Sequence, residues 1–206
     1  QIVIFTGVLF LLQIKMYLFL GWRLLEDQMG SVSHAIEFIL WGDGRASHTF
    51  LIASTREYPL MLIEIDVGDN EKGTRKSMRL NIQELNELPK NTTSLIYIGT
   101  AQSHMALNDL IESAHVYVTN HPIYNVLKNN CRTFVEYLID CVPEFKESIP
   151  RRNGSILEYY HHKAKTTHPG LLKKTKHLLE AIRQNYRKKK NNNDDDDDEL
   201  FQIDLK

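Results

Sequence analysis

The stretch Asn129–Leu138 (NNCRTFVEYL) decides how this chain is interpreted. Two asparagines, which are good helix-capping residues, come directly before Cys131. At about 100° per residue, four apolar side chains lie within roughly 60° of the direction of this cysteine: Phe134, Val135, Leu138 and Val142. We therefore expect a helix that starts at Cys131 and packs its cysteine side against the rest of the fold.

A thiol at the N-terminus of a helix has unusual chemistry. The helix dipole favours an anion at this end, so it stabilises the thiolate and makes the cysteine more nucleophilic. The alternative is a buried, inert cysteine, because free cysteines are among the most buried residues in proteins. Position alone leaves the inert cysteine as the default, and a nucleophile also needs a base.

The composition describes one domain of ordinary size with tails. The 206 residues are 42% hydrophobic, and the net charge of −1 gives no overall attraction to nucleic acid. The two cysteines, Cys131 and Cys141, share one predicted helix. They cannot pair there, because their directions differ by about 80° and they lie about 15 Å apart along the axis. A chain without a disulfide framework fits a reducing compartment.

The first part of the chain is strongly apolar. Residues 2–22 are interrupted by Thr6, Gln13 and Lys15, and about 20 apolar residues suffice to span a bilayer. Three interpretations stay open: a membrane anchor or span, a buried helix, and a signal peptide, although the basic leader of a signal is missing. We treat residues 1–30 as a separate segment and expect the protein in the cytoplasm or at the cytosolic side of a membrane.

Residues 31–150 are expected to form the main domain. Apolar runs between turn signals predict strands at 35–41, 47–54, 61–67 and 95–99. A capping-box pattern at Asn81–Glu84 predicts a short helix to Leu88. Helical spacing then predicts helices at about 103–120 and from Cys131 onward. Strands first and helices after predict an α+β fold, with a mainly antiparallel sheet packed against the cysteine helix.

The composition changes beyond Pro150. Residues 151–190 are expected to form a basic helical extension, because an apolar stripe from Leu171 to Tyr186 is surrounded by lysine and arginine. Residues 191–206 contain the run NNNDDDDDE and are expected to be disordered. The basic helix suits a membrane surface. It lacks interleaved aromatic residues, so no nucleic acid is expected as a partner.

A nucleophilic cysteine needs a base, usually histidine, and a group that orients the base. Among nine histidines, His48 opens an apolar strand directly after a polar turn and shares a face with Phe50 and Ile52. There it could meet a helix that packs across the sheet; the alternative is a partly exposed strand histidine. Glu64 is the candidate orienting group and Asp66 the second choice, although such alternating carboxylates usually mark the solvated side of a sheet.

An acyl intermediate also needs donors for its oxyanion. The backbone N–H of Cys131 at the helix start is a natural one. The hydroxyl of Tyr124, seven residues before the cysteine, could supplement it, and its alternative role is packing. We expect no cofactor and no metal.

The residues Tyr124–Val135 (YNVLKNNCRTFV) resemble the nucleophile motif of circularly permuted papain-like proteins. This NlpC-type superfamily includes lecithin:retinol-acyltransferase-like proteins and PPPDE-type isopeptidases. Its permuted arrangement places the histidine strand before the cysteine helix, as His48 precedes Cys131, and the upstream tyrosine matches the acyltransferase-like members. The resemblance covers about half the chain and implies a permuted papain-like fold, with Cys131 as nucleophile and His48 as base.

The chain departs from this family at three places. Family members often carry His or Asn directly before the motif phenylalanine, where this chain has Thr133. The acyltransferase-like members have Glu after the cysteine, where it has Arg132, and a second histidine soon after the first, whereas none lies between His48 and His104. These departures leave the third catalytic residue and the substrate class open.

The sequence therefore predicts a cysteine hydrolase that acts on an amide or isopeptide bond through an acyl-enzyme. His48 takes the proton of Cys131, the thiolate attacks the acyl carbon, and water or an acceptor amine or hydroxyl resolves the intermediate. Two alternatives stay open: a membrane-associated lipid acyltransferase or phospholipase, and an inactive papain-like binding module. The expected substrate is a peptide, an isopeptide or a lipid acyl group.

Overall fold

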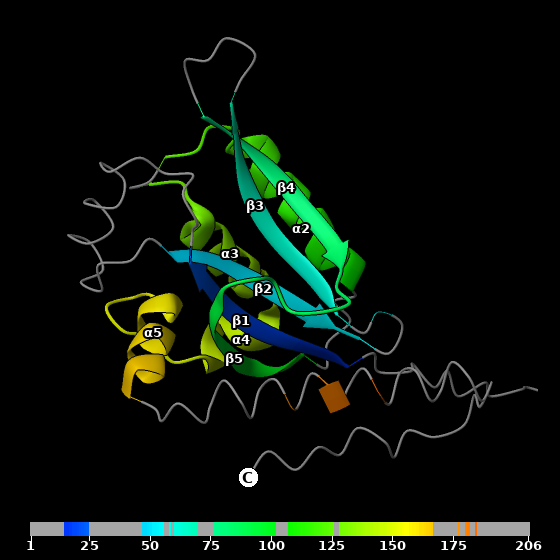
Figure 1. The fold of residues 1–206 in the computed structure, drawn as a ribbon. Helices are drawn as coiled ribbons and strands as arrows, with labels where there is room; N and C mark the ends of the chain where they lie inside the picture. The colour runs from blue at the N-terminus through cyan, green and yellow to red at the C-terminus, as the bar shows by residue number, and fades with distance from the viewer. Residues whose placement is uncertain are drawn as a thin grey trace, which may run out of the picture.

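The computed structural model of the chain describes residues 15–24, 47–55, 58, 60–69, 76–101, 107–125 and 128–166, together with 177, 180, 181 and 184. These residues form an α+β fold with a five-stranded antiparallel sheet (Figure 1). The elements in chain order are β1 (Met16–Leu24), β2 (Ser47–Ser54), β3 (Met61–Asp69), β4 (Lys76–Glu84), β5 (Thr92–Ala101), α2 (Leu107–Asn120), α3 (Cys131–Cys141), α4 (Pro143–Ser148) and α5 (Ile156–Thr166).

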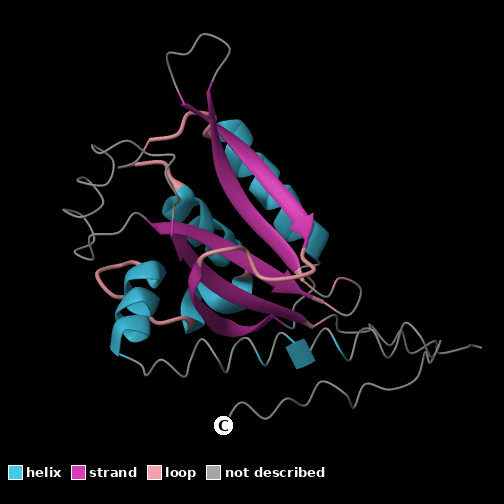
Figure 2. Cartoon of the chain, viewed as in Figure 1, coloured by secondary structure: helices cyan, strands magenta, loops and turns pink. Residues whose placement is uncertain are grey.

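The strands lie in the order β4-β3-β2-β1-β5, so β1 is paired on both sides. The connection from β4 to β5 must therefore pass over the other three strands. In Figure 2 it crosses in front of the sheet, whereas α2 and α3 lie behind it. Leu85 fixes the start of this crossing, because its N–H donates to the carbonyl of Leu60 at 2.9 Å.

Side-chain alternation along the strands builds two cores, one on each face of the sheet. On β2, Leu51 and Ala53 join the helix-side core, whereas Phe50 and Ile52 join the core under the 85–91 connection. The helix α3 buries four side chains completely in the helix-side core: Phe134, Val135, Leu138 and Ile139. Each contributes about 1.5–3 kcal/mol by leaving water, so the predicted apolar face is what docks α3.

The sheet opens between β2 and β3. Their ladder covers only Leu51–Ala53 and Met61–Ile63, whereas β3 pairs with β4 along all nine of its residues. Beyond this short ladder the two strands diverge (Figure 1). The helix α3 contacts both strands, and this opening is where its N-terminus meets the sheet.

Most of the predicted elements are confirmed. The strands at 47–54, 61–67 and 95–99 correspond to β2, β3 and β5, and the two predicted helices correspond to α2 and α3. The helix predicted from Asn81 to Leu88 is wrong, because residues 76–84 form β4. There Met78, Leu80 and Ile82 alternate toward the helix-side core, and pairing with β3 outweighs a local capping pattern. The strand expected at 35–41 lies outside the described residues.

The apolar N-terminal segment also needs correction. Its residues 16–22 belong to β1, which is paired with β2 on one side and β5 on the other, so the boundary expected at residue 30 does not separate them from the domain. Met16, Leu18 and Leu20 are buried in the helix-side core, and Tyr17 and Phe19 in the other. A strand buried on both faces reads as a continuous apolar run. No helix in the described part of the chain is long and apolar enough to cross a membrane. Residues 2–14 and nearly all of 167–206 lie outside the description.

Close packing of Gly21 in β1 gives a test of this strand assignment. An alanine Cβ at this position would lie 2.2 Å from the ring of Phe50, which is fully buried. We expect Gly21→Ala to lower the free energy of unfolding by about 1–3 kcal/mol in urea titrations. Phe50→Leu in the same chain should recover part of this loss, because it relieves the crowding. An unchanged free energy in Gly21→Ala would contradict the placement of β1.

Candidate active site

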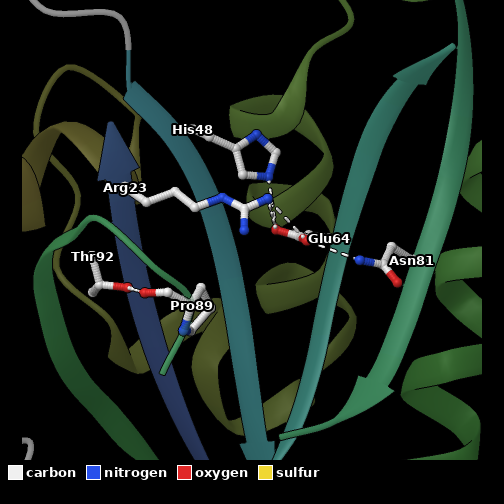
Figure 3. Close-up of polar contacts among 6 residues, drawn as sticks. All are labelled: Arg23, His48, Glu64, Asn81, Pro89 and Thr92. Carbon is white, nitrogen blue, oxygen red and sulfur yellow. Dashed lines mark hydrogen bonds and ion pairs between the residues drawn. The ribbon is translucent and has the colours of Figure 1, made fainter. Parts of the chain in front are cut away.

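Four neighbouring strands each contribute one polar side chain to a row on the sheet face opposite the helices. We call Arg23 of β1, His48 of β2, Glu64 of β3 and Asn81 of β4 the polar row (Figure 3). The register places Arg23 opposite His48 and Glu64 opposite Asn81. The row is therefore fixed by the strand pairing, and it bridges the opening between β2 and β3.

The central contact of the row joins His48 to Glu64. The Nε2 atom of His48 lies 3.0 Å from Oε2 of Glu64. Both residues are buried, with exposed fractions of 6% and 1%. The structure thus brings together the two residues that the sequence proposed as base and orienting group.

Glu64 is surrounded by donors. Nη2 of Arg23 donates to Oε1 at 3.1 Å and lies 3.0 Å from Oε2, and Nδ2 of Asn81 donates to Oε1 at 2.9 Å. Burial alone would raise the pKa of Glu64, but His48, Arg23 and Asn81 together hold it below its usual value. The carboxylate is therefore ionised at neutral pH.

Cys131 is positioned by the cap of α3. Oδ1 of Asn130 accepts from the N–H groups of Arg132 at 2.9 Å and Thr133 at 3.2 Å. Oγ1 of Thr133 in turn accepts from the N–H of Asn130 at 2.9 Å, which completes a capping box. The position where the family resemblance expects His or Asn is thus occupied by a capping residue. The cap fixes the first turn of the helix, and with it the thiol.

Residues before the cysteine are tied to the same turn. Nδ2 of Asn129 donates to the carbonyls of His121 at 3.2 Å and Ile123 at 2.7 Å. The hydroxyl of Tyr117 lies 2.8 Å from Oδ1 of Asn129 and 3.0 Å from Oγ1 of Thr133. These bonds connect α2, the segment that follows it and the start of α3, so the thiol stands on a rigid support.

Cys131 and His48 are hydrogen-bonded through their side chains. Because Nε2 of His48 faces Glu64, the ring nitrogen left for the thiol is Nδ1. The thiol is buried, with an exposed fraction of 4%, and the N–H of Thr49 also donates to its sulfur. The nucleophile, the base and the orienting group predicted from the sequence therefore form one continuous chain of contacts.

The charges around Cys131, His48 and Glu64 favour an ion pair between Cys131 and His48. Burial would raise the pKa of Cys131, but the charge and hydrogen bond of His48, the N–H of Thr49 and the charge of Arg132 lower it. Burial would lower the pKa of His48, but the thiolate and Glu64 raise it to about 10. Both shifts favour a Cys131 thiolate beside a His48 imidazolium, which is the reactive form of a cysteine nucleophile.

Arg132 is a second buried cation next to the thiolate. It is 6% exposed, and its Nη2 donates to Oγ of Ser47, the first residue of β2, at 3.2 Å. This bond ties the start of α3 to the start of the histidine strand. Arg132 therefore favours the thiolate by its charge and helps to set the distance between Cys131 and His48.

The two weaker candidates do not contact His48 in the way that Glu64 does. Asp66 is close enough to Glu64, His48 and Arg23 to feel their charges, but it is exposed on β3, opposite Arg79, whereas Glu64 is the carboxylate that contacts the His48 ring. Tyr124 packs its half-buried ring against the helix-side core, and its N–H donates to the carbonyl of Lys76 at 2.9 Å. Its role toward an oxyanion stays a prediction.

Two members of the polar row were missed by sequence reasoning. Arg23 follows the apolar run that was interpreted as a membrane segment, and Asn81 was assigned to a helix cap. A signal existed for both: Arg23 ends a run of strand-forming residues, and Asn81 lies between Leu80 and Ile82 in an alternating pattern.

Among the residues that the structure describes, no three His, Cys, Asp or Glu side chains are grouped to hold a metal ion. Cys131 and Cys141 are both free thiols. No protein-family model, no curated protein and no solved structure matches this chain. The function must therefore be argued from the geometry of the site.

The ion pair predicts an unusual titration of Cys131. In a Cys141→Ser background, alkylation by iodoacetamide should reach half of its maximal rate at a pH well below 8.5, the ordinary pKa of cysteine. His48→Ala removes the partner charge while the thiol stays buried, so only about 1% thiolate or less should remain at pH 6.5. We expect the rate at this pH to fall at least about tenfold. Equal rates in the two proteins would show that His48 does not activate the thiol.

Proposed function

We propose that this protein is a cysteine hydrolase with a permuted papain-like fold, which cleaves an amide or isopeptide bond through an acyl-enzyme. The observation that carries the proposal is the chain of contacts from Cys131 through His48 to Glu64. A thiol, a base and a group that orients the base are the parts that nucleophilic catalysis requires. Three buried polar groups would be costly to retain for stability alone.

The order of the elements supports the fold assignment. The histidine strand β2 precedes the cysteine helix α3 along the chain, as in the permuted superfamily that the motif around Cys131 resembles. The cysteine lies at the first position of a capped helix, and the sheet on which this helix packs supplies both His48 and Glu64.

In this mechanism the thiolate of Cys131 attacks the carbonyl carbon of the substrate, and a C–S bond forms. The His48 imidazolium then gives its proton to the leaving amine as the C–N bond breaks, which yields a thioester. Neutral His48 next takes a proton from water, the hydroxide attacks the thioester, and the acid product and the thiolate–imidazolium pair are restored. Glu64 holds the ring in one orientation and stabilises its charge in both steps.

A backbone donor is available for the oxyanion of the intermediate. The cap of α3 takes the N–H groups of Arg132 and Thr133. The N–H of Cys131 itself lies one residue earlier, at the positive end of the helix, and is suited to a developing negative charge beside the sulfur.

The lipid acyltransferase alternative has less support. It relied on the apolar segment at 2–22 and on the basic helix expected at 171–190. Residues 16–22 belong to an interior strand of the sheet, and most of 171–190 lies outside the described residues. It also expects a second histidine close after His48, which this chain lacks. We therefore place amide and isopeptide substrates first.

The test is to find which acyl donor labels Cys131. The protein is incubated with a library of peptide amides, with a library of isopeptides linked through lysine side chains, and with phosphatidylcholine vesicles, and the amine or lysolipid released is quantified. We expect release from an amide or isopeptide library, together with a trapped acyl adduct on Cys131 by mass spectrometry. Cys131→Ala should abolish the release, and His48→Ala should reduce it by about 10²–10⁴-fold.

Cys141→Ser is the matched control, because it removes the other free thiol and should leave the rate unchanged. Acylation of Cys131 by phospholipid alone would support the lipid acyltransferase instead. No acylation by any of the three donors would overturn the enzyme and leave the inactive binding module.

A further inference from the structure

We propose that Arg23 is a positioning residue of this site, which keeps the carboxylate of Glu64 charged and aligned so that His48 can hold its proton. This role rests on the proposed function. Its effect on the protonation of His48 and Cys131 can nevertheless be measured without any substrate. Arg23 does not touch the thiol; it acts through Glu64.

The geometry of Arg23 fits this role. It lies on β1, in register with His48, and its side chain runs along the sheet face to Glu64 (Figure 3). A single atom, Nη2, donates to Oε1 at 3.1 Å and lies 3.0 Å from Oε2. The guanidinium thus contacts both oxygens of the carboxylate, including the one that faces His48.

Burial makes this contact necessary. Glu64 is 1% exposed, whereas the side chain of Arg23 is 25% exposed, so Arg23 forms the side of the row that faces water. A buried carboxylate without a fixed cation tends to take up a proton. Without Arg23, the proton between Glu64 and His48 would move toward Glu64. His48 would then lose its charge, and the thiol of Cys131 would keep its own proton.

The charged groups around this proton come from four elements. Glu64 and Asp66 lie on β3, His48 on β2, Arg23 on β1, and Cys131 and Arg132 on α3. Arg132 acts on the thiolate from the helix side, whereas Arg23 acts on Glu64 from the sheet side. Within the described residues, Arg23 is the one arginine or lysine that forms an ion pair with Glu64.

Asn81 provides an internal comparison. Its Nδ2 donates to the same Oε1 of Glu64 at 2.9 Å, so it helps to orient the carboxylate. It is neutral, however, and cannot replace the charge of Arg23. Loss of Asn81 should therefore change the titration of Cys131 much less than loss of Arg23.

The experiment measures how the alkylation rate of Cys131 depends on pH, in the full chain with Cys141→Ser. Arg23→Met keeps the length of the side chain but removes its charge, and we expect the half-maximal pH to rise by at least about one unit. This corresponds to a rate about tenfold lower at pH 6.5. Arg23→Lys keeps a charge and should recover at least half of the shift, and Asn81→Ala should shift the midpoint by less than half a unit.

Arg151→Ala is the matched control. It also removes an arginine from an ion pair, with Asp140, but this pair lies at the surface, and the midpoint should not move. A wild-type midpoint in folded Arg23→Met, or no recovery by Arg23→Lys, would overturn the proposal. If Arg23→Met does not fold, as judged by circular dichroism, Arg23→Lys and Arg23→Gln decide in its place. A half-maximal pH near the ordinary cysteine pKa in the wild-type protein would instead contradict the proposed function itself. This outcome differs from the two outcomes that overturn only the role of Arg23.

Discussion

A carboxylate that is only 1% exposed is expensive to bury, by several kcal/mol, unless cations and hydrogen-bond donors surround it. Glu64 is such a group, and its three partners come from three different strands. The requirement to satisfy this charge links β1, β2 and β4 to β3 at the point where the ladder between β2 and β3 has ended. The opening in the sheet and the buried charge that bridges it therefore belong together. The opening gives α3 access to His48, and the contacts of Glu64 link β2 and β3 on the sheet face opposite the helices.

On the helix side of the site, polar groups are likewise paired by hydrogen bonds. The first turn of α3 would leave unpaired N–H groups, and the capping box of Asn130 and Thr133 pairs them. The bond from Arg132 to Ser47 then fixes this turn to the strand that carries His48. Cys131 is thus held between two rigid supports, and its thiolate is stabilised by the groups that also define its position. Stability and reactivity draw on the same contacts here.

Local patterns in the sequence were sufficient to predict the candidate site residues that lie on correctly predicted strands and helices. Alternation on β2 and β3 identified His48 and Glu64, and helical spacing identified the start of α3 at Cys131. The same reasoning failed where burial came from distant parts of the chain. The strand β1 is apolar on both sides because it lies between two cores, which a single sequence does not separate from a bilayer segment. Asn81 looked like a cap because only pairing with β3 reveals its strand.

The central claim is that His48 carries a positive charge at neutral pH because it stands between the Cys131 thiolate and the Glu64 carboxylate. Nitrogen-15 chemical shifts of the histidine ring measure this directly, since they distinguish an imidazolium from either neutral tautomer. At pH 8 the account predicts that both ring nitrogens of His48 are protonated, and that Glu64→Gln or Cys131→Ala weakens this protonation. A neutral His48 ring at pH 8 in the wild-type protein would contradict it.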